Sequence, residues 1–103
     1  MARVIVSDVA DADTAEAVAN IAGQAGPSAA RRFSARFERL YDRLADFPAS
    51  CQARPSLGKD IRVGVVFPYL VIYRFTKSDN TVGIVRVLHG KRNISRELLL
   101  SGS

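Results

Sequence analysis

Six cationic or imidazole side chains in the second half of the chain are the residues best suited to chemistry. The candidates for a basic, target-binding cluster are Arg62, Arg74, Arg86, His89, Lys91 and Arg92. Such a cluster can hold phosphate groups electrostatically, and it could stabilise the phosphorane-like transition state of a metal-free ribonuclease. The residue types therefore indicate an anionic target, and they leave binding and cleavage both open.

Cleavage through a 2′-hydroxyl also needs a general acid and a general base. Tyr69, Tyr73 and His89 are the neutral or near-neutral candidates, and tyrosines in a strand are more typical of a core. A single histidine without a second ligand at the usual spacing argues against a metal site, and the single Cys51 excludes an internal disulfide. The Gly-x-x-Gly at 23–26 lacks the Lys-Ser/Thr of a phosphate loop. We therefore predict no metal and no cofactor.

The elements that must position the cluster follow from hydrophobic periodicity. Strands are predicted over residues 2–6, 61–67, 69–77 and 81–88. The first predicted helix begins after a cap at Ser7 or Asp8, or at a second start at Asp13, and ends at about residue 22. Two more helices are predicted over 28–46 and 94–100. The order is β-α-α-β-β-β with a short C-terminal helix in one domain, 1–103. We predict an α+β fold in which a helical hairpin packs on an antiparallel meander sheet.

Faces of these elements follow from side-chain geometry. In the last strand, alternation predicts Val85 and Val87 on one face and Ile84, Arg86 and Leu88 on the other. In the strand before it, one face should carry Tyr69, Val71, Tyr73 and Phe75. Gly64 indicates a bulge or close packing. The second sheet face keeps apolar residues of its own (Leu70, Ile72 and Ile84), which favours a partner chain there or along an edge.

The helix predicted over 28–46 has an apolar face and a cationic stripe. The apolar face consists of Ala30, Phe33, Phe37, Leu40, Tyr41, Leu44 and Phe47, and the stripe of Arg32, Arg36, Arg39 and Arg43. The stripe is either a solvated face partly paired with neighbouring acidic residues or a docking surface for an acidic partner.

Charge is distributed unevenly along the chain. The net charge is +5, yet residues 1–30 hold four acidic residues and one basic residue, while residues 31–103 hold fourteen basic and six acidic residues. A basic surface favours nucleic acid, a nucleic-acid-bound enzyme or an acidic protein as partner. No apolar run is long enough to cross a membrane and the first residues lack a signal-peptide pattern, so we expect a cytoplasmic protein.

Several segments together resemble a known family. They are GPSAARRFSARFERLYDRLADFP, the RP-x-LG-x-DIR that follows, YLVIYRF and IVRVLHGKR. This combination is similar to the ParE toxins of bacterial type II toxin–antitoxin modules, within the RelE/ParE superfamily. The similarity extends from Gly26 to about Ile94 and is weak in the first helix. The superfamily fold has the element order predicted from the residues.

The resemblance implies a toxin that inhibits DNA gyrase and is neutralised by a ParD-like antitoxin. The antitoxin's acidic C-terminal arm would wrap the toxin in a hetero-oligomeric complex. Residues expected to contact it are Phe33, Arg36, Phe37, Leu40, Leu70, Ile72 and Ile84.

Departures from the family pattern bear on the alternatives. RelE-type members are ribosome-dependent mRNA endoribonucleases with a Tyr or His in the C-terminal segment, and NISRELLLSGS has neither. This favours gyrase inhibition by binding over cleavage, and we therefore predict no catalytic residues. The family's Arg-Asp ending is here Arg92-Asn93, which keeps open a third reading, an inactive toxin-like binding module.

Overall fold

The computed structural model describes residues 1–91. Its elements are β1 (Arg3–Val6), α1 (Asp8–Asp46), β2 (Gln52–Ala53), the 3₁₀ turn η1 (Pro55–Leu57), β3 (Ile61–Val66), β4 (Tyr69–Thr76), the 3₁₀ turn η2 (Lys77–Asp79) and β5 (Thr81–His89). The predicted C-terminal helix lies outside the described residues. None of the described helices has the length and apolar character needed to cross a membrane.

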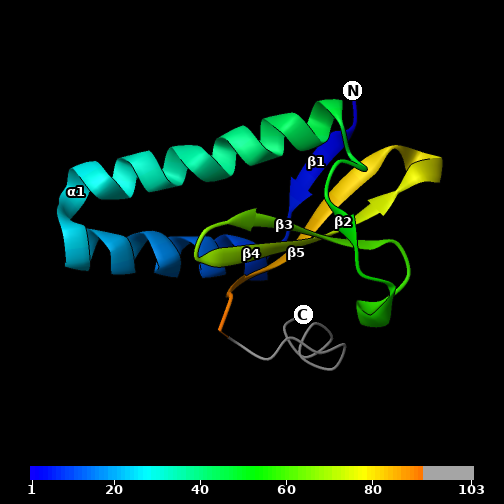
Figure 1. Cartoon of the computed structure of the whole chain (residues 1–103). Coiled ribbons are helices and arrows are strands. Elements are labelled where there is room, and N and C mark those ends of the chain that lie inside the picture. Colours follow the sequence, from blue (N-terminus) through cyan, green and yellow to red (C-terminus); the bar gives the residue numbers. More distant parts are fainter. Residues whose placement is uncertain (92–103) are drawn as a thin grey trace.

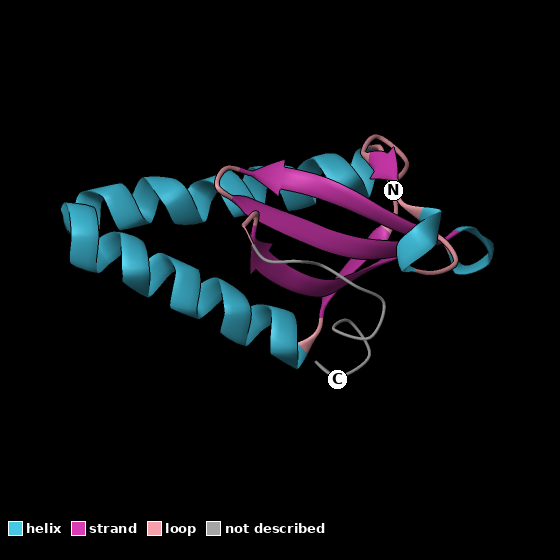
Figure 2. Cartoon of the chain, turned by 60° about the horizontal axis from the view of Figure 1, so that its bottom comes forward, coloured by secondary structure: helices cyan, strands magenta, loops and turns pink. Residues whose placement is uncertain are grey.

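Helix α1 consists of two arms that fold back at Gly26, and these arms form the predicted helical hairpin (Figures 1 and 2). Ser7 caps the first arm, because its hydroxyl accepts a hydrogen bond from the backbone N–H of Ala10 at 3.0 Å. Gly26 has φ 89° and ψ 171°, a conformation that L side chains rarely adopt, and Pro27 after it opens the second arm. The second arm ends at Asp46, as predicted.

Five strands form one sheet in the order β1-β5-β4-β3-β2. The pairs β2–β3, β3–β4 and β4–β5 are antiparallel, which confirms the meander. β1 runs parallel to β5. The helical hairpin follows β1 in the chain and covers one face of the sheet (Figures 1 and 2). β2 was not predicted, because a two-residue strand leaves no periodicity to detect.

The predicted alternation along β5 is wrong because the strand contains a bulge. Ile72 pairs with Arg86 but Tyr73 pairs with Ile84, so Val85 is an extra residue opposite β4. Ile84 and Val87 therefore both face the helical hairpin, while Val85 belongs with Leu88 to a cluster on the other face.

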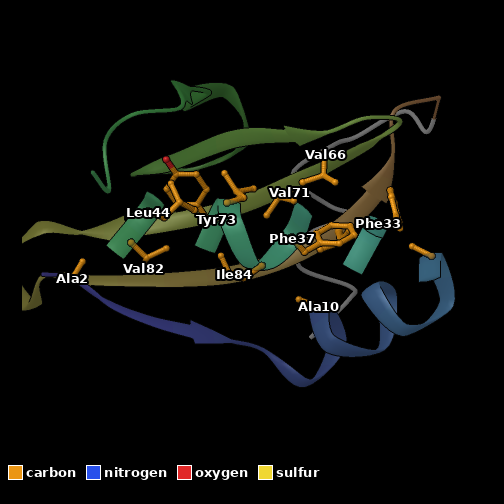
Figure 3. Packing of buried hydrophobic residues seen from close by; sticks show 13 residues of the cluster. Ala2, Ala10, Phe33, Phe37, Leu44, Val66, Val71, Tyr73, Val82 and Ile84 are labelled. Carbon is orange, nitrogen blue, oxygen red and sulfur yellow. The ribbon is translucent and has the colours of Figure 1, made fainter. Parts of the chain in front are cut away.

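The main core lies between the hairpin and the sheet (Figure 3). The predicted face of β4, with Tyr69, Val71, Tyr73 and Phe75, packs into this main core. A Cβ on Gly64 would lie 3.2 Å from Leu40 Cδ2 and 3.2 Å from Cys51 Sγ, which confirms close packing at this glycine. A second cluster, made of Leu57, Ile61, Ile72 and Leu88, lies on the opposite face.

Candidate functional site

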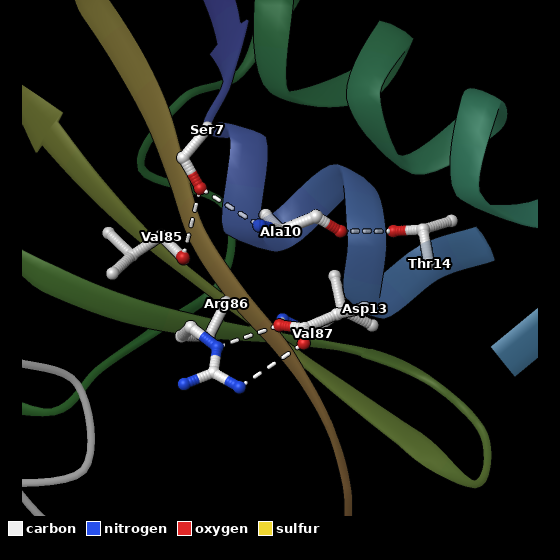
Figure 4. Close-up of polar contacts among 7 residues, drawn as sticks. All are labelled: Ser7, Ala10, Asp13, Thr14, Val85, Arg86 and Val87. Atoms are coloured by element: carbon white, nitrogen blue, oxygen red, sulfur yellow. Dashed lines mark hydrogen bonds and ion pairs between the residues drawn. The ribbon is translucent and has the colours of Figure 1, made fainter. Parts of the chain in front are cut away.

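Arg86 is held by one carboxylate of the first helical arm (Figure 4). Its Nε donates to Asp13 Oδ2 at 2.7 Å, and one terminal nitrogen donates to Asp13 Oδ1 at 3.2 Å. The backbone N–H of Val87 also donates to Asp13 Oδ2, at 3.0 Å. The Arg86 and Asp13 side chains are only 11% and 15% exposed. Asp13 therefore neutralises Arg86 and also bonds the strand backbone.

The local fold explains why a helix residue meets β5 here. β1 pairs with β5 only as far as Ile84, so the backbone groups of β5 beyond that residue lack a strand neighbour on this side. Ser7 follows β1 directly, and its hydroxyl donates to the carbonyl of Val85 at 3.1 Å. Asp13 then accepts from Val87. Side chains at the start of α1 thus provide hydrogen-bond partners for the backbone groups of β5 that β1 does not reach.

The electrostatics of Arg86 fit a structural role. The hydrogen bonds that Arg86 donates to the Asp13 carboxylate raise the pKa of the Arg86 guanidinium above its ordinary value, and partial burial opposes this only in part. The Nε and the terminal nitrogen of Arg86 that face Asp13 both donate to its carboxylate, so the positive charge of Arg86 is largely compensated within the chain.

Arg62 and Arg74, two other residues of the predicted cluster, lie where β3 begins and β4 ends. One terminal nitrogen of Arg62 donates to the carbonyls of Cys51 at 2.7 Å and Ala49 at 3.2 Å, so Arg62 holds the loop after α1. Arg74 Nε donates to the carbonyl of Lys59 at 3.2 Å. Both arginines thus anchor loops next to the strand ends.

His89 and Lys91 lie at the other end of the sheet, where β4 begins and β5 ends. The His89 ring makes an edge contact with Tyr69, with centroids 5.3 Å apart, and its Nδ1 accepts from the Lys91 backbone N–H at 3.1 Å. The residues predicted as one basic cluster are therefore spread over the sheet. Antiparallel pairing separates Arg62 and Arg74 from His89 by the length of β4. Arg92 lies outside the described residues.

A cleft of about 210 Å³ lies beside His89, between the first helical arm and the end of β5. Its polar lining residues are Asp13, Glu16, Asn20, Tyr69 and His89. These groups could exchange protons with a bound molecule. Within residues 1–91, no group of three or more His, Cys, Asp or Glu side chains is placed to hold a metal ion.

Most residues expected to contact a partner belong to the core. Phe33, Phe37 and Leu40 are 5%, 2% and 5% exposed and pack against the sheet, and Ile84 faces the same core. Ile72 is buried on the opposite face. Of the remaining two, Leu70 is half-buried and Arg36 is exposed. Contact of Leu70 and Arg36 with a partner stays a prediction. The buried residues of the set could touch a partner only if the core packing around them opened.

Sequence reasoning missed two features of this region. Asp13 was predicted as an alternative start of the first helix, and nothing local connects it to a strand 73 residues away. Phe67 was assigned to a strand, but it lies in the β3–β4 turn and is 74% exposed. Exposed large apolar residues close together are informative, and Val65, at 59% exposed, lies nearby on β3.

Comparisons with known proteins agree with this fold. Residues 4–94 match the model of the family described as the ParE toxin of the type II toxin–antitoxin system, parDE. Toxin ParE3 of Caulobacter vibrioides is 30% identical over 98 residues, which cover 95% of this chain and 96% of the relative. A structure titled chromosomal ParDE TA system from P. aeruginosa superposes with a TM-score of 0.71 at 18% identity, covering 86% of this chain and 96% of that chain. The chain therefore belongs to the ParE toxin family of type II toxin–antitoxin systems.

Proposed function

We propose that this ParE-family toxin inhibits DNA gyrase by binding it, and that a ParD-like antitoxin with an acidic C-terminal arm neutralises the toxin in a hetero-oligomeric complex. The proposed site of action is the bacterial cytoplasm, where gyrase acts on DNA. Family membership supports the toxin role, and the arrangement around Arg86 supports binding over RNA cleavage.

The ion pair between Arg86 and Asp13 is the observation that carries this proposal. A metal-free ribonuclease needs cationic groups that face the scissile phosphate. Arg86 faces a carboxylate of its own chain, at 2.7 Å, and the same carboxylate fixes the backbone of β5. Redirecting Arg86 to a substrate would leave Asp13 without its cation and would weaken the contact between α1 and the sheet.

A second candidate function is ribosome-dependent mRNA cleavage, and one observation favours it. Tyr69, His89 and Glu16 line the same cleft, which gives the chain groups able to donate and accept protons. The carboxylate of Glu16 in the same lining disfavours a phosphate group close by. We therefore rank this function second.

Two reactions run in parallel separate these candidates. Purified toxin is added to a gyrase supercoiling reaction, and the same preparation is added to translating ribosomes whose mRNA is then mapped for cleavage. We expect dose-dependent loss of supercoiling and intact mRNA, with supercoiling restored by a ParD-like antitoxin, to be sought in the adjoining reading frame. Cleaved mRNA with normal supercoiling would replace the proposal by the ribonuclease function.

Expression without the antitoxin tests the third alternative, an inactive binding module. Inducible expression should stop growth, and co-expression of the antitoxin should restore it. Normal growth at a toxin level confirmed by immunoblot would contradict the toxin role and favour the binding module.

A further inference from the structure

A surface formed by the second helical arm and the β3–β4 turn combines exposed cations with exposed apolar groups. We call it the arginine–turn surface and define it by Arg36, Arg39, Arg43, Val65 and Phe67. We propose that it binds an acidic, amphipathic protein segment in which carboxylates flank at least one large apolar side chain. The inference rests on the proposed function, because it assigns that segment to the antitoxin.

The helix and the turn are connected directly. A terminal nitrogen of Arg36 donates to the backbone carbonyl of Phe67 at 3.1 Å, and the guanidinium carbon lies 5.8 Å from the centroid of the Phe33 ring. The β3–β4 turn extends toward the bend of the helical hairpin (Figures 1 and 2). Arg36 thus holds the turn against the helix, so the two parts present one surface.

The charges of this surface are not compensated within the described chain. Arg36, Arg39 and Arg43 are exposed at intervals of three and four residues and therefore point the same way. Among residues 1–91, the pair Arg86–Asp13 is the only one whose charged atoms lie within 4.0 Å. Of the two alternatives for the stripe, pairing with neighbouring acidic residues is therefore not found among residues 1–91, and these arginines are free to meet external carboxylates.

Two grooves on this surface could take apolar side chains. The first, of about 380 Å³, is lined by Arg36, Arg39, Leu40, Arg43, Val65 and Val66. The second, of about 270 Å³, is lined by Val65, Phe67, Pro68, Tyr69, Leu70, His89, Gly90 and Lys91. Val65 lies between the grooves, and it is 59% exposed while Phe67 is 74% exposed.

An acidic peptide fits this surface better than a nucleic acid does. A phosphate backbone calls for a continuous row of cations, whereas here the arginines flank aliphatic and aromatic side chains. Arginine forms paired hydrogen bonds with carboxylates, and an apolar side chain placed between those carboxylates would cover Val65 and Phe67. Charges at the rim and an apolar anchor at the centre are typical of protein–protein recognition.

The test measures binding of a full-length ParD-like antitoxin, to be sought in the adjoining reading frame, to full-length toxin by isothermal titration calorimetry. Arg39→Glu/Arg43→Glu should raise the Kd about tenfold or more, because attraction becomes repulsion, and should flatten its salt dependence. Phe67→Ser should also raise the Kd about tenfold, as loss of a central anchor does.

Matched controls keep the comparison specific. Arg3→Glu/Arg31→Glu makes the same charge change at exposed positions outside the two grooves, and Phe47→Ser removes a phenylalanine that is 65% exposed at the end of the helix. Both controls should stay within about threefold of the unaltered toxin, as peripheral residues do. Far-UV circular dichroism and urea midpoints must match for every variant that is compared.

Several outcomes would overturn the inference. If the antitoxin binds the unaltered toxin and both surface variants equally well, the inference fails while the proposed function stands. If the surface variants lose gyrase inhibition but keep the antitoxin, the surface belongs to the target. If they lose only affinity for a labelled oligonucleotide, the ligand is phosphate. If the unaltered toxin does not bind the antitoxin, the proposed partner fails as well.

Discussion

The carboxylate of Asp13 accepts two hydrogen bonds from Arg86 and one from the backbone of Val87, across 73 residues of sequence. This contact joins the first helical arm to β5 directly beyond the last residue that β1 covers. Ser7 satisfies the neighbouring carbonyl of Val85. A strand edge that β1 leaves open is thus bonded by the helix that follows it, and Arg86 is part of that structural contact.

Asp13→Asn should destabilise the toxin by about 1–3 kcal/mol, the range for removing one partner of a charged, partly buried hydrogen-bonded pair. The amide keeps an oxygen for the Val87 N–H but leaves the Arg86 charge without a counter-ion. Urea denaturation followed by circular dichroism at pH 7 measures the change.

Asp11→Asn is the control for this measurement, because Asp11 is exposed on the same helical arm. It should cost no more than about 0.5 kcal/mol through the helix dipole. Adding Arg86→Met to Asp13→Asn should recover part of the loss, since coupled residues deviate from additivity by about 0.5–3 kcal/mol. Equal effects of the two single amide variants would contradict the structural role of Asp13.

The sequence predicts those parts of the fold that depend on local signals. Ser7 as a cap, the break at Gly26 and Pro27 and the meander strands all follow from residue type and periodicity. The bulge at Val85 depends on how β5 pairs with β4, and it places Ile84 on the face of Val87 and Val85 on the face of Leu88. The candidate site was less predictable, because the Arg86 contact and the exposure of Phe67 depend on tertiary packing.

Gly26→Ala should destabilise the toxin by about 1–3 kcal/mol, because φ of 89° is strained for an L side chain. Gly23→Ala serves as the comparison. Gly23 lies in the helical first arm with nothing within 4 Å of an added Cβ, so alanine there should stabilise by about 0.5–1 kcal/mol. Thermal unfolding of both variants measures the difference, and a similar sign for the two would contradict the assigned bend.

Gly64→Ala should cost about 1–3 kcal/mol, as overpacking of a core does. Its Cβ would lie 3.2 Å from Leu40 Cδ2 and from Cys51 Sγ, whereas a Cβ on Gly83 meets nothing within 4 Å. Gly83→Ala should therefore leave stability unchanged or raise it slightly. Chemical denaturation of both variants decides, and an equal loss at Gly83 would show that the packing at Gly64 is not the cause.

Stability should fall as pH rises above the ordinary tyrosine pKa of 10.0. Burial raises the pKa of Tyr41 and, more strongly, that of Tyr73. The unfolded chain then loses these protons at a lower pH than the folded chain, so the free energy of unfolding decreases through this range. Urea denaturation between pH 8 and pH 11 (about one to two units on either side of that pKa) measures the slope.

Two phenylalanine variants separate these contributions. Within the described residues, the buried Tyr41 hydroxyl has no hydrogen-bond partner, so Tyr41→Phe should cost nothing at neutral pH and should reduce the alkaline loss. The Tyr73 hydroxyl donates to the carbonyl of Pro48 at 2.9 Å, so Tyr73→Phe should cost about 1 kcal/mol. A costly Tyr41→Phe would indicate a hydrogen bond at that hydroxyl.

The most direct test of inhibition by binding is a gyrase supercoiling reaction titrated with the Asp13→Asn/Arg86→Met variant. This variant removes the guanidinium and its counter-charge together, and urea denaturation first establishes that it is folded. If the toxin acts by binding and Arg86 is structural, the folded variant inhibits supercoiling within about threefold of the unaltered toxin and leaves ribosome-bound mRNA intact. Loss of inhibition in a folded variant, or mRNA cleavage that depends on Arg86, would contradict the account.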